Sequence, residues 1–328
     1  MSRNSSARAF PSIRLSQDGL KIVYRLAAIG VICLALGSRN HAFFTTGNIL
    51  NVLRQASLLF FMASGLTLVI LTGQIDLSIG ANVGLSACLA ATVIKTTGSP
   101  WLGSLAGLGI GSLVGLVNGL VVTRLRLPSF IATYGMLWVG NGLTYYYMGG
   151  QTIDGFPPGF RALGSGFWMG IPIPVYLMAV FLLVGALFSQ RTIYGRELYF
   201  IGANATTARL SGIPVERRLM LVFVVSGAMA GLASLIFLAR LNSAEGDIGE
   251  SLTLPAVAAA AIGGASLFGG SGSLFGTLLG AIILTLFLNG MNLLLINANW
   301  QPFVTGVAMV ASVWLDMAST GRLFWRRD

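Results

Sequence analysis

The sequence predicts an all-α fold, a polytopic bundle of membrane-spanning helices, from its composition and from the length of its apolar runs. Hydrophobic residues make up 55% of the 328-residue chain, charged residues make up only 9%, and the mean hydropathy is +0.81. Such a chain has too little polar surface to cover a soluble domain. Because a spanning helix needs about 20 mostly apolar residues, the chain has room for about ten spans and little else.

Apolar runs of suitable length follow one another along the chain and predict about eight to ten crossings. Glycines at 263, 264, 269, 270, 272 and 276 interrupt the runs between Leu254 and Ile296, so a span there should be short or discontinuous. We expect one transmembrane domain over residues 20–318, with tails at 1–19 and 319–328. The runs are Leu20–Gly37, Val52–Thr72, Leu77–Ile94, Trp101–Val122, Ser129–Met148, Ile171–Phe188, Leu219–Leu238, Leu254–Phe268, Leu274–Ile296 and Phe303–Met317.

The distribution of positive charge predicts the orientation of these spans. Most of the 20 lysines and arginines fall in the two tails or in the segments after the fourth and sixth runs. Positively charged segments stay in the cytoplasm, so both termini should be cytoplasmic in a bacterial inner membrane. The net charge of +10 does not indicate a nucleic-acid partner, because the charges lie between apolar runs. The first run has no small-residue cleavage site, so we expect a span there rather than a signal peptide.

Glycine spacing predicts where helices pack closely. The chain has 43 glycines, and Gly107, Gly111, Gly115 and Gly119 recur every four residues along the fourth run. They form one stripe on a helix, and small residues let helix backbones approach in a membrane. We expect a tight helix contact at this stripe; a role in lining a solute path is the alternative.

Catalytic and metal-binding motifs are not found in the sequence. The two lysines, Lys21 and Lys95, do not follow a glycine, so the phosphate-binding loop of an ATPase is absent. One histidine, His41, and two cysteines inside apolar runs, Cys33 and Cys88, do not make a metal-ligand cluster. We expect no enzyme activity, no catalytic residue, no metal and no cofactor bound by this chain.

A helix-break motif lies between the second and third runs and consists of Gly73, Asp76, Ser78 and Gly80. Ionisable groups are costly inside a bilayer, so Asp76 is a candidate functional residue. Its expected role is to cap the third span through nearby backbone N–H groups, and a direct transport role is the alternative. Asp316, close to Arg322, is expected at the membrane interface.

The cytoplasmic segment 190–218 is predicted to contain a short helix of about two turns. Asn204 is a favourable N-cap, Gly212 suits the left-handed position after a helix, and Pro214 cannot continue it. Such a capped helix is either a docking element for a partner or an ordinary surface helix, and the residues alone do not decide between the two.

Four motifs follow one another along the chain: Gly65–Ile70 with Ile75–Gly80, Pro128–Thr133, Gly202–Ile213 and Ile262–Gly270. In these motifs the chain resembles the permease subunit of bacterial ATP-binding-cassette importers for monosaccharides, the ribose-type sugar permeases, from Phe44 to Asp316. Relatives commonly have an acidic stretch where this chain has Thr253–Val257, closer to the Leu-Pro-Ala form of autoinducer-type permeases. They also often have Gly-Gly-Asn where this chain has Gly202–Asn204.

The resemblance implies partners that the sequence itself lacks. Permeases of this kind pair with a second permease subunit over two separate ATPases, which use the ATP, and receive solute from a periplasmic binding protein. The short helix from about Ala205 to Ser211 is then the coupling helix that contacts the ATPase. The residues implied in this coupling are Asn204, Thr207, Ala208, Arg209, Ser211, Gly212 and Ile213.

Solute-lining residues are expected among polar side chains within the spans. Amides and phenols satisfy sugar hydroxyls without charge, although each could equally form an interhelical hydrogen bond. An ion-coupled secondary transporter and a passive channel remain as alternative functions, with Asp76 as the one titratable candidate for ion coupling. The candidate lining residues are Asn118, Tyr134, Asn141, Asn289 and Asn292.

Overall fold

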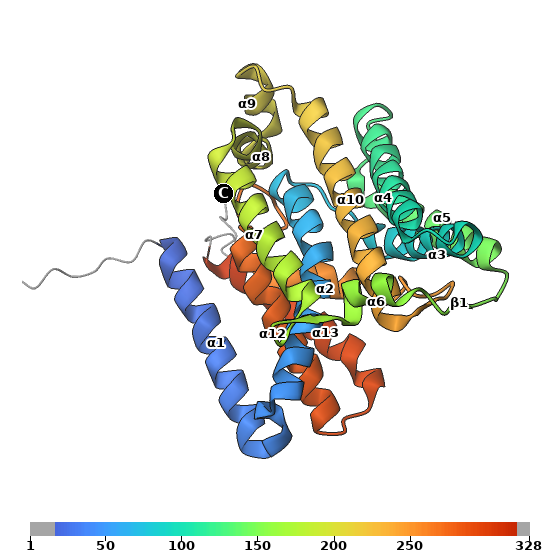
Figure 1. Cartoon of the computed structure of the whole chain (residues 1–328). Helices are drawn as coiled ribbons and strands as arrows, with labels where there is room; N and C mark the ends of the chain where they lie inside the picture. Colours follow the sequence, from blue (N-terminus) through green and yellow to red (C-terminus); the bar gives the residue numbers. More distant parts are fainter. Residues whose placement is uncertain (1–16, 320–328) are drawn as a thin grey trace, which may run out of the picture.

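The computed structural model describes residues 17–319, which form a bundle of helices with two very short β ladders (Figure 1). Each predicted apolar run overlaps one of these helices, which confirms the polytopic all-α fold. The predicted tails, 1–19 and 319–328, and Arg322 lie almost entirely outside the described residues. The helices in the runs are α1 Gln17–Arg39, α2 Thr46–Leu71, α3 Ile79–Thr97, α4 Pro100–Thr123, α5 Ser129–Met148, α7 Ile173–Arg191, α10 Val215–Leu241, α11 Thr253–Ile262, α12 Leu274–Leu293 and α13 Gln301–Ser319.

Length and composition separate these helices into two groups. Seven helices in the described part, α1, α2, α3, α4, α7, α10 and α12, are long and apolar enough to cross a membrane. Helices α5 and α13 are of similar length but fall outside this set, and α11 has only 10 residues. The expectation that a span between Leu254 and Ile296 is short is therefore confirmed at α11.

Smaller elements join the long helices. The two-residue strands form antiparallel pairs, with Ile153 opposite Ala244 and Phe167 opposite Pro172. Strands β2 and β3 are joined by Met169 and Gly170, both at positive φ, as a tight hairpin turn requires. Of these elements, only α9 was predicted from the sequence. They are η1 His41–Phe44, β1 Ile153–Asp154, α6 Pro158–Ser165, β2 Phe167–Trp168, β3 Ile171–Pro172, α8 Ile193–Ala203, α9 Ala205–Leu210, β4 Ser243–Ala244 and η2 Ala298–Trp300.

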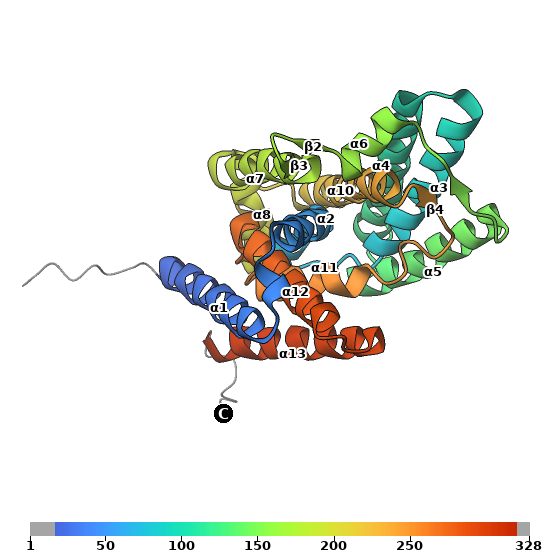
Figure 2. The same ribbon diagram turned by 60° about the horizontal axis from the view of Figure 1, so that its bottom comes forward.

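Helix α2 is the centre of the bundle. Figure 2 looks nearly along α2 and shows α10, α11 and α12 around it. Phe60, Phe61 and Met62 on α2 are completely buried, although they are large apolar side chains that lipid would also accept. A helix that is apolar on every side and enclosed by other helices is typical of the interior of a membrane bundle.

The glycine stripe of α4 lies against α10, which confirms the predicted tight contact. A Cβ atom at Gly111 would lie 2.5 Å from the carbonyl oxygen of Gly227 and 2.8 Å from the Cα of Gly231. A Cβ atom at Gly115 would collide with the backbone of Phe223. The two helices therefore meet backbone to backbone, which is possible only where neither helix has a side chain.

Two breaks in the helices lie side by side. The first separates α2 from α3 at residues 72–78, and the second separates α11 from α12 at residues 263–273. The N–H of Gly270 donates to the carbonyl of Leu71 at 3.0 Å, and a Cβ at Gly269 would lie 2.8 Å from the Cα of Gly73. One backbone hydrogen bond and a close glycine contact therefore join the second break to the end of α2, and the hydrogen bond satisfies a backbone group on each side.

The helix α13 is attached to the second break. The hydroxyl of Ser266 donates to Oδ2 of Asp316 at 2.8 Å. The carboxylate thus has a defined role in holding α13 against the connection between α11 and α12.

Candidate functional site

A buried polar network surrounds Asp76 at the first break. Oδ1 of Asp76 accepts from the backbone N–H of Ser78 at 3.1 Å and from its hydroxyl at 2.7 Å. Oδ2 accepts from the hydroxyl of Ser226 on α10 at 3.0 Å, and Nδ2 of Asn118 on α4 donates to the Ser78 hydroxyl at 2.7 Å. These four residues are each at most 2% exposed. The carboxylate therefore joins the start of α3 to both α4 and α10.

The contacts of Asp76 differ in detail from the expected cap on the third span. Asp76 does accept from a backbone N–H ahead of α3, but at Ser78 rather than in the first helical turn. In the first turn, the N–H of Gly80 donates to Oγ1 of Thr253 on α11 at 3.1 Å. The start of α3 is thus held by a tertiary partner that the local sequence does not reveal.

The predicted short helix in the segment 190–218 is present as α9, which lies at the end of the bundle seen at the top of Figure 1. Oδ1 of Asn204 accepts from the N–H of Thr207 at 2.9 Å, as an N-cap does. Gly212 has a φ of +85°, and the N–H of Ile213 donates to the carbonyl of Ala208 at 3.1 Å. Both ends of α9 are therefore closed by its own flanking residues.

Side-chain contacts fix α9 to the beginning of α10. Ala208 packs with Ile201 and Val215 in a small buried cluster. Arg209 of α9 forms an ion pair with Glu216 of α10 at 2.6 Å. The outward side of α9 is open, and Leu210 there is 85% exposed.

The segment α8 supplies a second connection to α10. Arg218 on α10 forms an ion pair with Glu197 on α8 and lies 4.2 Å above the ring of Tyr194. Consequently α8, α9 and the first turns of α10 form one unit at this end of the molecule.

The structure does not gather the candidate solute-lining residues into one cavity. Asn118 belongs to the Asp76 network, and Asn141 is buried on α5. The amides of Asn289 and Asn48 exchange hydrogen bonds of 2.8 and 3.1 Å.

The two other candidates are more exposed. Asn292 accepts from Nε2 of Gln301 at 2.9 Å. Tyr134 is 46% exposed and is stacked with Phe130, with 6.0 Å between the ring centroids. Asn118, Asn289 and Asn292 thus form the interhelical hydrogen bonds that the sequence left open as the alternative.

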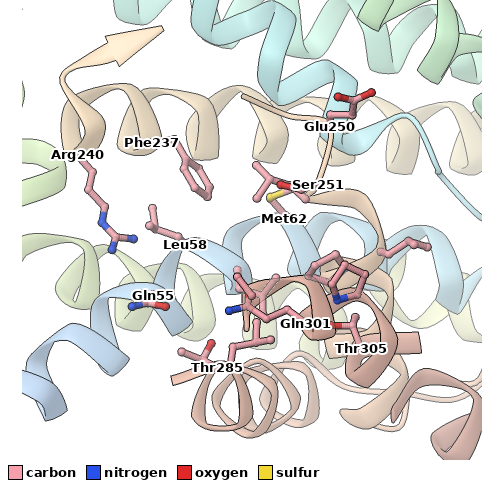
Figure 3. A pocket seen from close by; sticks show the side chains of 17 residues that line it. Gln55, Leu58, Met62, Phe237, Arg240, Glu250, Ser251, Thr285, Gln301 and Thr305 are labelled. Atoms are coloured by element: carbon pink, nitrogen blue, oxygen red, sulfur yellow. The ribbon is translucent and has the colours of Figure 1, made fainter. Parts of the chain in front are cut away.

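A cavity of about 520 Å³ lies near the end of α10 remote from α9 (Figure 3). Residues of α2, α10, α11, α12 and α13 form most of its walls. Its volume is within the range of small-molecule sites, which are mainly apolar with a few oriented polar groups. The polar side chains on its walls are Gln55, Arg240, Glu250, Ser251, Thr285, Gln301 and Thr305.

These residues were not among the candidates predicted from the sequence, although some of them have a recognisable pattern. Gln55, Thr285 and Thr305 are polar residues inside apolar runs, the same criterion that selected the asparagines. Around the cavity, the hydroxyl of Tyr145 donates to Oε2 of Glu250 at 3.1 Å, and Arg54 lies 4.9 Å above the ring of Phe167. The cavity thus offers amide, hydroxyl, guanidinium and carboxylate groups that can bind a hydroxylated solute.

Within residues 17–319, no three histidine, cysteine, aspartate or glutamate side chains come together as metal ligands would. A bundle of broken and continuous apolar helices around a mainly apolar cavity with a few polar groups is the architecture of a membrane transport permease.

Comparison with known proteins gives the family. The chain belongs to the family "Branched-chain amino acid transport system / permease component", whose model matches residues 48–313. This match confirms the family resemblance and defines a multi-pass inner-membrane transport subunit rather than an enzyme. No solved structure matches the chain significantly.

Curated relatives are similar over nearly their whole lengths. The ribose import permease protein RbsC of Bacillus subtilis (strain 168) is 38% identical over 288 residues, covering 87% of this chain and 89% of the relative. RbsC of Escherichia coli (strain K12) is 37% identical over 295 residues, covering 89% and 92%. The autoinducer 2 import system permease protein LsrC of Klebsiella pneumoniae is 34% identical over 302 residues, covering 92% and 87%.

Proposed function

We propose that this chain is the transmembrane permease subunit of an ATP-binding-cassette importer for a monosaccharide or a similar small polyhydroxylated solute. Its partners are a cytoplasmic ATPase, which hydrolyses the ATP, a periplasmic solute-binding protein and a second permease subunit. The names of the curated relatives support the importer class and the solute class.

The capped helix α9 is the main observation that supports the proposal. It lies beyond the spans, at the end that the charge distribution assigns to the cytoplasm, and its outward side is open. An ATPase that docks there acts on α10 directly, because Ala208 packs on Val215 and Arg209 pairs with Glu216. This anchorage supports a docking role for α9 rather than that of an ordinary surface helix.

Helix α10 links this docking end to the cavity. Its 27 residues span about 40 Å at 1.5 Å per residue. Phe237 and Arg240 near its far end line the cavity of about 520 Å³. A tilt of α10 that begins at α9 therefore changes the walls of the cavity, which is the physical basis proposed for alternating access.

The geometry favours this mechanism over an ion-coupled transporter. The carboxylate of Asp76 accepts three hydrogen bonds from serine groups and is 2% exposed, so its contacts are those of a structural tie. A passive channel is not driven by an ATPase and therefore does not require a helix on which an ATPase docks. Both alternatives predict uptake without an ATPase.

Reconstitution into liposomes tests the proposal. The chain, its ATPase and the binding protein should take up ribose or another sugar of a monosaccharide panel only when ATP is supplied. Gly212→Val should uncouple ATP hydrolysis from uptake, because a β-branched residue at φ +85° costs about 1–2 kcal/mol and displaces the end of α9.

The control is Gly98→Val, which imposes similar backbone strain after α3, where Gly98 has a φ of +67° and no atom within 4 Å of its Cβ position. This variant should remain coupled. ATP-independent uptake by the wild-type chain, or equal loss of coupling in both variants, would contradict the proposal.

A further inference from the structure

A second groove, of about 840 Å³, lies at the end of the molecule that contains α9. It is bounded by the connection between α4 and α5, by α9 and by the first turns of α10. Four arginines line it, Arg124, Arg126, Arg209 and Arg217, with Glu216 as the one acidic residue. The groove therefore carries a strong excess of positive charge.

Most of this charge is not neutralised within the protein. Two ion pairs occur in the part of the chain that the structure describes, Arg209 with Glu216 and Arg218 with Glu197. Arg124, Arg126 and Arg217 form no ion pair among the described residues, although Arg126 interacts electrostatically with Glu216, which is already paired with Arg209. Three guanidinium groups on one groove are a site for an anion, and arginine binds phosphate especially well because its donors match the phosphate oxygens.

The groove lies where α4 ends and where α5 and α10 begin. Arg124 follows the last residue of α4, Pro128 precedes the first residue of α5, and Arg217 is in the first turn of α10. By the charge distribution this is the cytoplasmic boundary of the bilayer, where phospholipid headgroups lie.

Apolar side chains are exposed beside the arginines. Leu125 is 67% exposed, Leu127 is 43% exposed and Phe130 is 56% exposed. Leu127, Leu219 and Met220 also line the groove itself. A soluble phosphate would contact only the arginines, whereas a lipid supplies both a phosphate for the arginines and acyl chains for the apolar residues.

The backbone holds one arginine in an unusual conformation. Arg126 has a φ of +56°, a backbone conformation that residues other than glycine rarely adopt. Strained positions of this kind persist where surrounding structure imposes them and are frequent at ligand sites. The position is consistent with a residue placed for a ligand, and it adds to the charge and location of the groove.

We propose that this groove binds the phosphate headgroup of an anionic phospholipid from the cytoplasmic leaflet. The lipid would bridge Arg124 and Arg126, on the α4–α5 connection, to Arg217 on α10. It would also lie beside Arg209, so the lipid contributes to holding α9 and α10 in place.

The test measures lipid retention by the full chain alone, without ATPase or solute, so its outcome is separate from that of the importer proposal. Wild-type protein in detergent is mixed with phosphatidylglycerol or phosphatidylcholine, and bound lipid is counted by native mass spectrometry. Phosphatidylglycerol should bind in preference. Arg126→Gln with Arg217→Gln should weaken its binding by about 30-fold, as expected for two arginines near an anionic lipid.

The matched control removes two other arginines from the same side, Arg191→Gln with Arg196→Gln, which are exposed and lie outside the groove. This control should retain the wild-type preference. The double variant Arg126→Lys with Arg217→Lys should also retain most of the preference for phosphatidylglycerol, because the positive charge remains. This variant controls for misfolding caused by substitution at the two positions.

Three results would overturn the proposal. Equal loss in the groove and control variants would mean that overall positive charge is responsible. Displacement of the lipid by millimolar inorganic phosphate would indicate a soluble anion as ligand. No preference for phosphatidylglycerol over phosphatidylcholine in the wild type would exclude an anionic lipid as the ligand of the groove.

Discussion

The α4–α10 contact and the helix α9 both depend on glycine, for different physical reasons. At Gly115 the backbone of Phe223 occupies the space that a side chain would need. At Gly212 no atom lies within 4 Å of the Cβ position, and the requirement comes from a φ of +85°. The first glycine serves a tertiary contact and the second serves a local turn, so the two regions should respond to substitution in separate ways.

The largest effect is expected at the tertiary contact. Gly115→Leu must separate α4 from α10 and should destabilise the fold by about 3 kcal/mol or more. Gly109→Leu is the control, because Gly109 lies on the same helix with nothing within 4 Å of its Cβ position. Thermal unfolding in detergent and the yield of monodisperse protein measure the difference. If the two variants prove equally stable, α4 and α10 do not pack in this way.

A smaller effect is expected at the polar network that ties α3 to α4 and α10. Asp76→Ala leaves the hydroxyls of Ser78 and Ser226 without their acceptor, which should cost about 1–3 kcal/mol. Ser226→Ala removes one of these bonds and should cost less. The measurement is thermal unfolding together with uptake. A variant Asp76→Asn that unfolds like the wild type but loses ion-dependent uptake would instead assign a transport role to Asp76.

The smallest effect is expected at α9, and it should remain local. Asn204→Ala removes the acceptor for the Thr207 N–H and should destabilise the helix by about 1 kcal/mol. Hydrogen exchange at residues 205–210 should accelerate while the melting temperature of the whole protein stays unchanged. Asn204→Asp keeps the acceptor and should restore slow exchange. A fall in global stability would show that α9 is part of the cooperative core.

Elements that depend on neighbouring residues could be predicted. Each of the ten apolar runs overlaps a helix, and seven of these helices are long and apolar enough to cross a membrane, because the apolar length of a segment is visible in the sequence itself. Asn204 caps the beginning of α9 and Gly212 follows its end, as predicted, because an N-cap and a left-handed turn need only a few adjacent residues. The stripe from Gly107 to Gly119 could likewise be assigned to a close contact.

Features that join distant segments could not be predicted in the same way. The spacing of Gly227 and Gly231 on α10 matches that of the α4 stripe, but spacing does not name a partner helix. The solute-lining candidates were chosen for their polarity, and polarity is equally required of a residue such as Asn289, which bonds across helices to Asn48. The cavity residues Gln55 and Thr305 differ from them only in what lies around them.

The sequence by itself determined that this protein is a multi-span membrane permease with a capped helix at one end. The length of the apolar segments, the position of the charged residues and the caps of a helix are all properties of contiguous residues. Only the tertiary structure decided that α4 packs on α10 and that the connection between α11 and α12 is hydrogen-bonded to the end of α2. It also decided which side chains line the cavity and the arginine groove. These features arise from contacts between residues far apart in the chain, and a polar or small residue carries no local sign of which distant partner it will meet.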